Sequence, residues 1–183
     1  TGDEFLDSNH IMATAKHFIG DGGTFKGIDK GDTRISEGGL KNIHGTPYYS
    51  AFEACVQSVM ASFNSWNGVK MHGHEYLLTD VLRDQMGFNG LVVGDWNGHG
   101  EVPGCTNANC PESFNAGVDI YMAPDEWKEL YTNTVRAVKA GDISEDRLDD
   151  AVRKILTVKD RLGMLDGRKP HEYENYVGKI EHR

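Results

Sequence analysis

One carboxylate in the sequence stands where catalytic chemistry is readily placed. Asp95 follows the run Leu91-Val92-Val93-Gly94 and precedes Trp96. An uninterrupted apolar run bounded by glycine is typical of a strand buried on both faces of a parallel sheet. The end of such a strand lies on the face where barrels of β/α units carry their active sites. An anionic oxygen beside an indole suits a sugar ring, although an Asp after a strand also serves as a helix cap.

Two further polar side chains lie near the end of an earlier predicted strand. Residues 13–18 read as that strand, and they include Lys16 and His17. Because the carboxyl ends of parallel strands converge on one face, we expect this ammonium and this imidazole near Asp95. There they could donate hydrogen bonds to neighbouring hydroxyl groups of a sugar. Consecutive strand residues point to opposite faces, so both can line one pocket only where the backbone departs from regular β geometry. A surface ion pair beside a loop histidine is the alternative.

Other motifs carry weaker signals. His72-Gly73-His74 resembles the His-x-His of metal-dependent hydrolases, but it lies at a predicted helix start and has no matched acidic cluster. A metal-dependent amidohydrolase using His72 and His74 is therefore kept only as an alternative. The loop at 20–24 lacks the Gly-Lys-Ser/Thr ending of a phosphate-binding loop, and no dinucleotide fingerprint follows the first strand. We expect neither a metal nor a cofactor.

The cysteines carry information about the cellular compartment of the protein rather than about its catalysis. The chain has 3 cysteines and no Cys-x-x-Cys pair, which argues against a zinc site. Cys105 and Cys110 flank a short polar loop and could be bridged in an oxidising compartment, although spacing alone does not establish their geometry. Cys55 lies inside a helical pattern and is expected to be a small buried hydrophobe.

Composition excludes several classes of partner. The net charge of the 183 residues is -9, and the basic residues are scattered, which argues against nucleic acid and anionic membrane surfaces. No apolar run approaches the ~20 residues of a membrane span. The chain begins at Thr1 with no initiator Met or signal peptide, so we expect a cut inside a longer protein.

The elements that must position these residues alternate between strand and helix. Strands are predicted over 13–18, 58–63, 90–95 and 118–122. Helices are predicted from Thr46-Pro47 to about 56, over 74–86, 111–116, 124–140 and from the Ser144 cap to 162. The last has a predicted apolar face formed by Leu148, Ala151, Val152, Ile155 and Leu162. Alternation repeated in this way indicates parallel β/α units, either a small open sheet or half of an eight-stranded barrel.

Several motifs in order resemble a known family. They are Lys16-His17-Phe18, Val59-Met60 with Trp66-Asn67-Gly68, the stretch 90–96, and Ala116-Gly117-Val118-Asp119. Together they resemble glycoside hydrolase family 3, which includes β-glucosidases and exo-acting β-glucan glucohydrolases. The loops at 20–24 and 66–72 look closest to the exo-glucanase branch of plants and bacteria.

The resemblance implies a retaining hydrolase that removes terminal β-D-glucosyl residues from β-glucosides or β-glucan oligosaccharides, with Asp95 as the nucleophile. A non-catalytic sugar-binding relative is the alternative, and no sequence feature supports a scaffold role. Phe63 stands where many relatives have Tyr, and Gly94 where many have Ser. The resemblance also implies a set of residues around the terminal glucose: Lys16, His17, Trp96, Met60 and Phe63.

The resemblance covers the latter half of the family's first domain. It implies a partial (β/α)₈ TIM barrel, about four β/α units of the C-terminal half, over residues 1–166, with a linker or tail over 167–183. In this branch a second domain supplies the general acid, and no residue here matches that acid. We therefore expect the isolated chain to be inactive or nearly so, since general acid catalysis contributes ~10²–10⁴-fold. A periplasmic or secreted location is expected.

Overall fold

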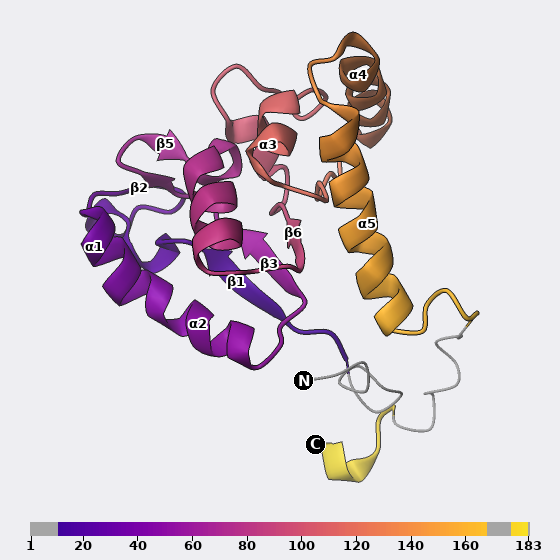
Figure 1. Cartoon of the computed structure of the whole chain (residues 1–183). Coiled ribbons are helices and arrows are strands. Elements are labelled where there is room, and N and C mark those ends of the chain that lie inside the picture. Colours follow the sequence, from indigo (N-terminus) through magenta and orange to yellow (C-terminus); the bar gives the residue numbers. More distant parts are fainter. Residues whose placement is uncertain (1–10, 168–176, 183) are drawn as a thin grey trace.

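The computed structural model describes residues 11–167 and 177–182, and its centre is a parallel sheet (Figure 1). The order in that sheet is β1-β3-β6. The strands are β1 (Thr14–Phe18), β3 (Ser58–Ala61) and β6 (Leu91–Val93). Each is separated from the next by helical segments, which is the connection that parallel pairing requires. Three of the predicted strands are confirmed in order and direction, and the predicted tail beyond 167 falls largely outside the described residues.

The fourth predicted strand is much shorter than expected. Over 118–122 the chain forms a single parallel bridge, between Val93 and Ile120. Beyond that bridge, backbone contact continues irregularly: the Gly94 N–H donates to the Ile120 carbonyl at 2.8 Å, and the Asn97 N–H donates to the Met122 carbonyl at 2.9 Å. The segment therefore follows β6 without forming a full ladder beside it.

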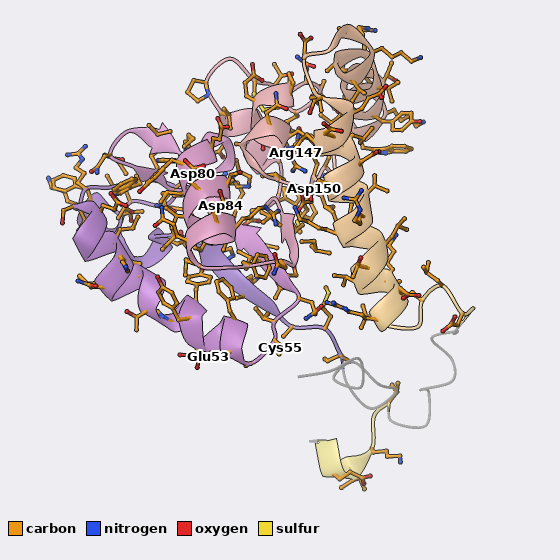
Figure 2. All side chains as sticks on the ribbon, in the orientation of Figure 1. Glu53, Cys55, Asp80, Asp84, Arg147 and Asp150 are labelled. Atoms are coloured by element: carbon orange, nitrogen blue, oxygen red, sulfur yellow. A yellow bond between two sulfur atoms is a disulfide. The ribbon has the colours of Figure 1, made fainter. Side chains whose placement is uncertain are left out.

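The helices before β3 form one continuous run. It consists of α1 (Glu37–Gly39), η4 (Leu40–Gly45) and α2 (Thr46–Glu53). The predicted helix start at Thr46-Pro47 is therefore wrong: the run begins after Ser36, whose Oγ caps it by accepting the Gly39 N–H at 3.2 Å. Cys55 was expected inside this helix, but it follows the helix end with a φ of 60° and is half-buried (Figure 2).

A small second sheet has the order β2-β4-β5. Its hairpin turns at Asn67 and Gly68, a pair that is itself a turn signal in sequence, and their φ values of 48° and 91° suit a two-residue hairpin turn. The other described elements are η2 (Asp21–Gly23), η3 (Phe25–Gly27), β2 (Asp32–Thr33), β4 (Ser65–Trp66), β5 (Val69–Lys70), η5 (Met71–Gly73), η6 (Tyr76–Gln85), η7 (Gly98–Glu101), α3 (Pro111–Ala116), α4 (Trp127–Ala140), α5 (Glu145–Arg161) and η9 (Ile180–His182).

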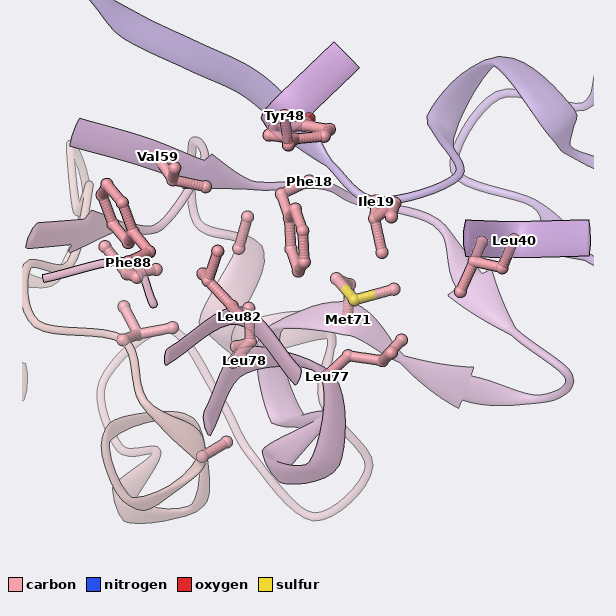
Figure 3. Close-up of a cluster of buried hydrophobic side chains, with 14 residues drawn as sticks. Phe18, Ile19, Leu40, Tyr48, Val59, Met71, Leu77, Leu78, Leu82 and Phe88 are labelled. Atoms are coloured by element: carbon pink, nitrogen blue, oxygen red, sulfur yellow. The ribbon is translucent and has the colours of Figure 1, made fainter. Parts of the chain in front are cut away.

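The main core packs the sheet against the α1–α2 run and η6 (Figure 3). Phe18 from β1 meets Tyr48 of α2 edge to face, with ring centroids 4.9 Å apart. The helix predicted over 74–86 is present as η6, and its residues Leu77, Leu78 and Leu82 are all buried in this core. Burial of such aliphatic side chains contributes ~1.5–3 kcal/mol each.

The last long helix, α5, begins as its sequence predicts. The Ser144 Oγ accepts the Arg147 N–H at 3.1 Å, which confirms the predicted cap. The predicted apolar face is partly wrong. Ala151 is buried, but Val152 is 42% exposed, and Val158 is buried in the same helix. The reason is that the face turned to the sheet carries a charged residue, Arg147, which takes up part of the contact.

One buried carboxylate joins two helices to the sheet. Asp119 has a fully buried side chain, and its Oδ2 accepts from Arg83 Nη2 at 2.6 Å and from the Val92 N–H at 2.8 Å. Its Oδ1 accepts from Arg147 Nη2 at 2.9 Å. Figure 2 shows Arg147 and Asp150 on the side of α5 toward the sheet. A buried charge persists only when it is paired and hydrogen-bonded, so this carboxylate fixes η6 and α5 against β6.

Replacing Asp119 by Asn should lower the free energy of unfolding by about 3–5 kcal/mol, because two guanidinium groups lose their buried counter-charge. Urea denaturation monitored by circular dichroism measures the change. The matched control is Asp149→Asn on the exposed face of α5, which should change the free energy by less than about 0.5 kcal/mol. Equal midpoints for the two variants would contradict this role of Asp119.

Candidate active site

The sheet aligns two of the predicted site residues in one row. The register pairs Lys16 of β1 with Met60 of β3, and Met60 with Val93 of β6. These three residues therefore lie side by side near the carboxyl ends of their strands. Asp95 comes two residues after Val93, just beyond the end of β6. The predicted placement of Asp95 at a strand end is confirmed.

The backbone of β1 departs from regular geometry at His17. Lys16 pairs with Met60, but the next pairing joins Phe18 to Ala61, so His17 is an extra residue in the ladder. The Lys16–His17 peptide bond in this segment is cis. A bulge of this kind re-aims the side chain at the extra position. The departure from β geometry that the sequence required is therefore present.

His17 lies between two carboxylates. Its Nε2 is 3.4 Å from Asp95 Oδ2, and its Nδ1 is 3.3 Å from Asp21 Oδ2. The Asp95 side chain is 16% exposed and that of His17 is 31% exposed, so both remain partly accessible to solvent. Asp21 was missed in the sequence, although its position four residues after His17, in a glycine-rich loop, was a usable signal.

Lys16 does not join this contact. Its side chain is exposed, and within the described residues it forms no ion pair with Asp95. Lys16 and His17 instead line a cavity of about 490 Å³ beside β1, together with Asp21 and Tyr48. Burial, with a smaller contribution from Asp21, raises the pKa of Tyr48, so its hydroxyl keeps its proton. Asp95 does not line this cavity, and His17 therefore stands between the cavity and the nucleophile candidate.

The backbone and the carboxylate of Asp95 are both held. The Asp95 N–H donates to His72 Nε2 at 2.8 Å, and Asp95 Oδ1 accepts the Trp96 N–H at 2.7 Å. His72 is only 1% exposed, and burial lowers its pKa to about 4 although the Asp95 carboxylate acts in the opposite direction. The imidazole is neutral near pH 7 and can accept this hydrogen bond.

The other predicted pocket residues differ in exposure. Met60 is buried at 8% exposure, whereas Trp96 is 60% exposed and presents an indole surface beside Asp95. Phe63 is half-buried, and its ring centroid lies 5.8 Å from that of His72. The Lys30 ammonium lies 4.1 Å from the centroid of the Phe63 ring. Trp96 is therefore open to solvent, whereas Phe63 is packed between His72 and Lys30.

A charged cluster adjoins Phe63 and was missed in the sequence. Glu101 accepts from Lys30 Nζ at 2.6 Å and from Lys70 Nζ at 3.0 Å. Burial alone would raise the pKa of Glu101, but the hydrogen bonds from the two ammonium groups lower it below its ordinary value. Lys30 lies in a loop, Lys70 in β5 and Glu101 in η7, so nothing in their sequence spacing indicates the cluster.

The two histidines of the His72-Gly73-His74 motif have separate partners. His72 Nε2 accepts from Asp95, and His74 Nδ1 lies 3.4 Å from the Leu77 N–H. The group of candidate metal ligands found in the described residues consists of Cys105, Cys110 and Glu112, and its two cysteines form a disulfide. Over the same residues, no helix is both long and apolar enough to span a membrane.

The domain alternates parallel strands with helices, and the Asp95 carboxylate follows one of the strands, 3.4 Å from the His17 imidazole and next to the exposed Trp96 indole. The chain belongs to glycosyl hydrolase family 3: residues 4–158 match the Glycosyl hydrolase family 3 N terminal domain. This membership removes the support for an amidohydrolase that uses His72 and His74.

Relatives in this family are glycosidases. A beta-xylosidase of Formosa agariphila is 36% identical over 197 residues, covering 100% of this chain and 27% of the relative. A periplasmic beta-glucosidase of Salmonella typhimurium is 33% identical over 170 residues, covering 90% of this chain and 22% of the relative. The chain therefore spans about a quarter of the length of these proteins.

Solved structures share the fold. An exo-1,3/1,4-beta-glucanase of a Pseudoalteromonas species is 49% identical with a TM-score of 0.92, covering 97% of this chain and 23% of that protein. A beta-glucosidase of Listeria innocua in complex with glucose is 26% identical with a TM-score of 0.81, covering 90% of this chain and 23% of that one. The helices and parallel sheet described above are therefore those of the family's N-terminal domain.

The burial of His72 predicts a pH dependence of stability. In the unfolded chain a histidine binds its proton near pH 6.5, whereas folded His72 binds it only near pH 4. Acidification from pH 7 to 5 therefore favours the unfolded state, by about 2 kcal/mol from this residue. This destabilisation is nearly absent above pH 6.5, grows as the pH falls, and levels off once the pH is below about 4.

The comparison that isolates His72 is with His72→Gln, which cannot take up this proton. His74 and His99, whose pKa values are also lowered by burial, contribute equally to the pH dependence of stability in the wild type and the variant. Denaturant unfolding at pH 7 and pH 5 should show the wild type losing about 2 kcal/mol more than the variant. Equal losses would mean that His72 is not held neutral.

Proposed function

We propose that the protein carrying this chain is a retaining β-glycosidase that removes terminal β-D-glucosyl residues from β-glucosides or β-glucan oligosaccharides. The observation that carries the proposal is the placement of Asp95 just beyond β6, with its Oδ2 3.4 Å from His17 Nε2 and its backbone bonded to His72. The family membership and the glucanase and glucosidase activities named for its relatives support the same interpretation.

Asp95 acts as the nucleophile in this proposal. An oxygen of its carboxylate attacks the anomeric carbon while the bond to the leaving oxygen breaks, and a covalent glycosyl ester forms on Asp95. Water then attacks the same carbon and releases the sugar, so two inversions give net retention. Oδ1 is engaged by the Trp96 N–H, which leaves Oδ2, beside His17, as the attacking oxygen.

The substrate-binding roles follow from exposure and chemistry. His17 and the exposed Lys16 ammonium supply donors to the hydroxyls of the terminal glucose. Trp96 supplies an exposed indole face for the pyranose. Met60 and Phe63 line the pocket floor, since Met60 is in the same row of the sheet as Lys16 and Phe63 contacts His72.

The remaining catalytic group is assigned to another part of the protein. Residues 1–166 form the C-terminal half of a (β/α)₈ barrel in this proposal, with 167–183 as a linker to a second domain that supplies the general acid. In support, β1 lies at an edge of the sheet, and the chain spans only 19–27% of the first relatives it matches. A further barrel strand would pair with that edge.

The same proposal includes a periplasmic or secreted location. Disulfides persist in oxidising compartments, and Cys105 is bonded to Cys110. A relative named as a periplasmic beta-glucosidase adds support.

A β-xylosidase is the second candidate, because the Formosa agariphila relative named as one aligns with the whole of this chain. A xyloside differs from a glucoside by the missing hydroxymethyl group, so the two activities need different space around that carbon. A non-catalytic sugar-binding protein is the third candidate. It would bind glucose through Lys16 and His17 without turnover.

Assays of the full-length protein on aryl β-D-glucoside and aryl β-D-xyloside separate these candidates. We expect kcat/KM to be higher for the glucoside, and we expect Asp95→Asn to lower it by about 10⁴-fold or more. Asp29→Asn, which changes an exposed loop carboxylate, is the matched control and should leave kcat/KM unchanged. A preference for the xyloside would favour the second candidate, and sugar binding without turnover the third.

A further inference from the structure

The Asp95 amide, just beyond the carboxyl end of β6, has no strand partner. The Gly94 N–H donates to the Ile120 carbonyl, and the Asn97 N–H donates to the Met122 carbonyl. Successive N–H groups of a strand point to opposite sides, so the Asp95 N–H points toward β3, as the Leu91 N–H does when it donates to the Gln57 carbonyl. The pairing of β3 with β6 ends at Met60 and Val93, so no strand carbonyl lies opposite the Asp95 N–H. A buried amide without an acceptor is costly, and the acceptor here is His72 Nε2 at 2.8 Å.

The chain is shaped to admit the His72 ring. A Cβ at Gly98 would lie 2.3 Å from His72 Cε1 and Nε2, closer than any side-chain atom tolerates. A Cβ at Gly94 would lie 3.4 Å from His72 Cδ2. The Phe63 ring packs against the imidazole from another side, at 5.8 Å between centroids. Glycines on both sides of Asp95 therefore let a buried ring reach the backbone of the nucleophile candidate.

The His72 contact acts on the carboxylate through the backbone. Asp95 Oδ1 accepts the Trp96 N–H, so the direction of the side chain depends on where the 95–96 backbone lies. That backbone is bonded to His72 through the Asp95 N–H. A nucleophile must be placed to within about 0.5 Å, and a misplacement of about 1 Å costs up to about 10²-fold in rate.

We infer that His72 is a positioning residue for Asp95: its unprotonated Nε2 replaces a strand carbonyl, fixes the Asp95 amide, and so aims the carboxylate at the anomeric carbon. This inference rests on the proposed function for its kinetic consequences. It assigns to His72 neither a metal nor a contact with substrate, and the ring stays inside the protein throughout the reaction.

The test compares two variants in the full-length protein. His72→Leu keeps much of the volume but removes the acceptor, whereas His72→Gln supplies an amide oxygen that can accept the Asp95 N–H. On an aryl β-D-glucoside we expect the Leu variant to lose about 10²-fold in kcat with KM changed by less than about threefold. We expect the Gln variant to recover most of that loss. Recovery by Gln is the readout that loss of packing alone would not produce.

The matched control is His99→Leu. His99 is equally buried at 1% exposure, but its Nε2 contacts the Asn107 carbonyl and not Asp95. Its loss should lower the melting temperature while leaving kcat within about threefold. A kcat for His72→Leu within threefold of wild type would overturn the inference, as would equal losses in the Leu and Gln variants.

Gly98→Ala replaces His72→Leu if that variant does not fold. The added methyl group presses against the His72 ring and should lower kcat at constant KM, and an unchanged kcat in the folded variant contradicts the role.

Hydrogen–deuterium exchange of a peptide covering 91–97 tests the same contact without turnover. Exchange at the Asp95 amide should be at least tenfold faster in the Leu variant, and unchanged exchange would overturn the inference. Asp95→Asn reports separately on the nucleophile, so a failure of the proposed function is distinguishable.

Discussion

Side-chain acceptors replace missing strand carbonyls along β6 and just beyond its end, and the site depends on this substitution. Buried amides need acceptors, but the 118–122 segment meets β6 at a single bridge, and the pairing of β3 with β6 ends at Val93. Asp119 Oδ2 accepts the Val92 N–H, and His72 Nε2 accepts the Asp95 N–H. The two acceptors differ in charge. Asp119 remains charged because Arg83 and Arg147 face it, whereas His72 remains neutral because burial disfavours its cation.

These two contacts link the fold to the chemistry. Asp119 accepts from Val92 and holds β6 against η6 and α5. Farther along the same strand, His72 accepts from Asp95 and sets the direction in which Asp95 leaves the strand. At the opposite edge of the sheet, the bulge at His17 brings an imidazole to the Asp95 carboxylate. His72 therefore holds the backbone of Asp95, and His17 lies beside its carboxylate. Of the two histidines, only His17 is exposed enough to contact a substrate.

Local patterns predicted those features that local physics determines. The Ser144 cap, the Asn67-Gly68 turn and the position of Asp95 after an apolar strand each depend on residues close in sequence. The errors arise where tertiary contacts decide. His72 and Asp95 are 23 residues apart, and Asp119 and Val92 are 27 apart, so neither pairing leaves a local signal. Val152 was assigned to the core because periodicity does not reveal that Arg147 occupies part of the buried face. The roles of Lys16, His17, Trp96, Met60 and Phe63 toward a sugar stay predictions.

The measurement that tests the central claim most directly is mass spectrometry of the full-length protein after reaction with a 2-fluoro-β-glucoside carrying a good leaving group. The fluorine slows hydrolysis of the glycosyl ester, so the intermediate accumulates on the nucleophile. The account predicts one added fluoroglucosyl group, located by peptide fragmentation on Asp95. A label on any other carboxylate, or sustained turnover of a β-glucoside with Asp95 unmodified, would contradict it.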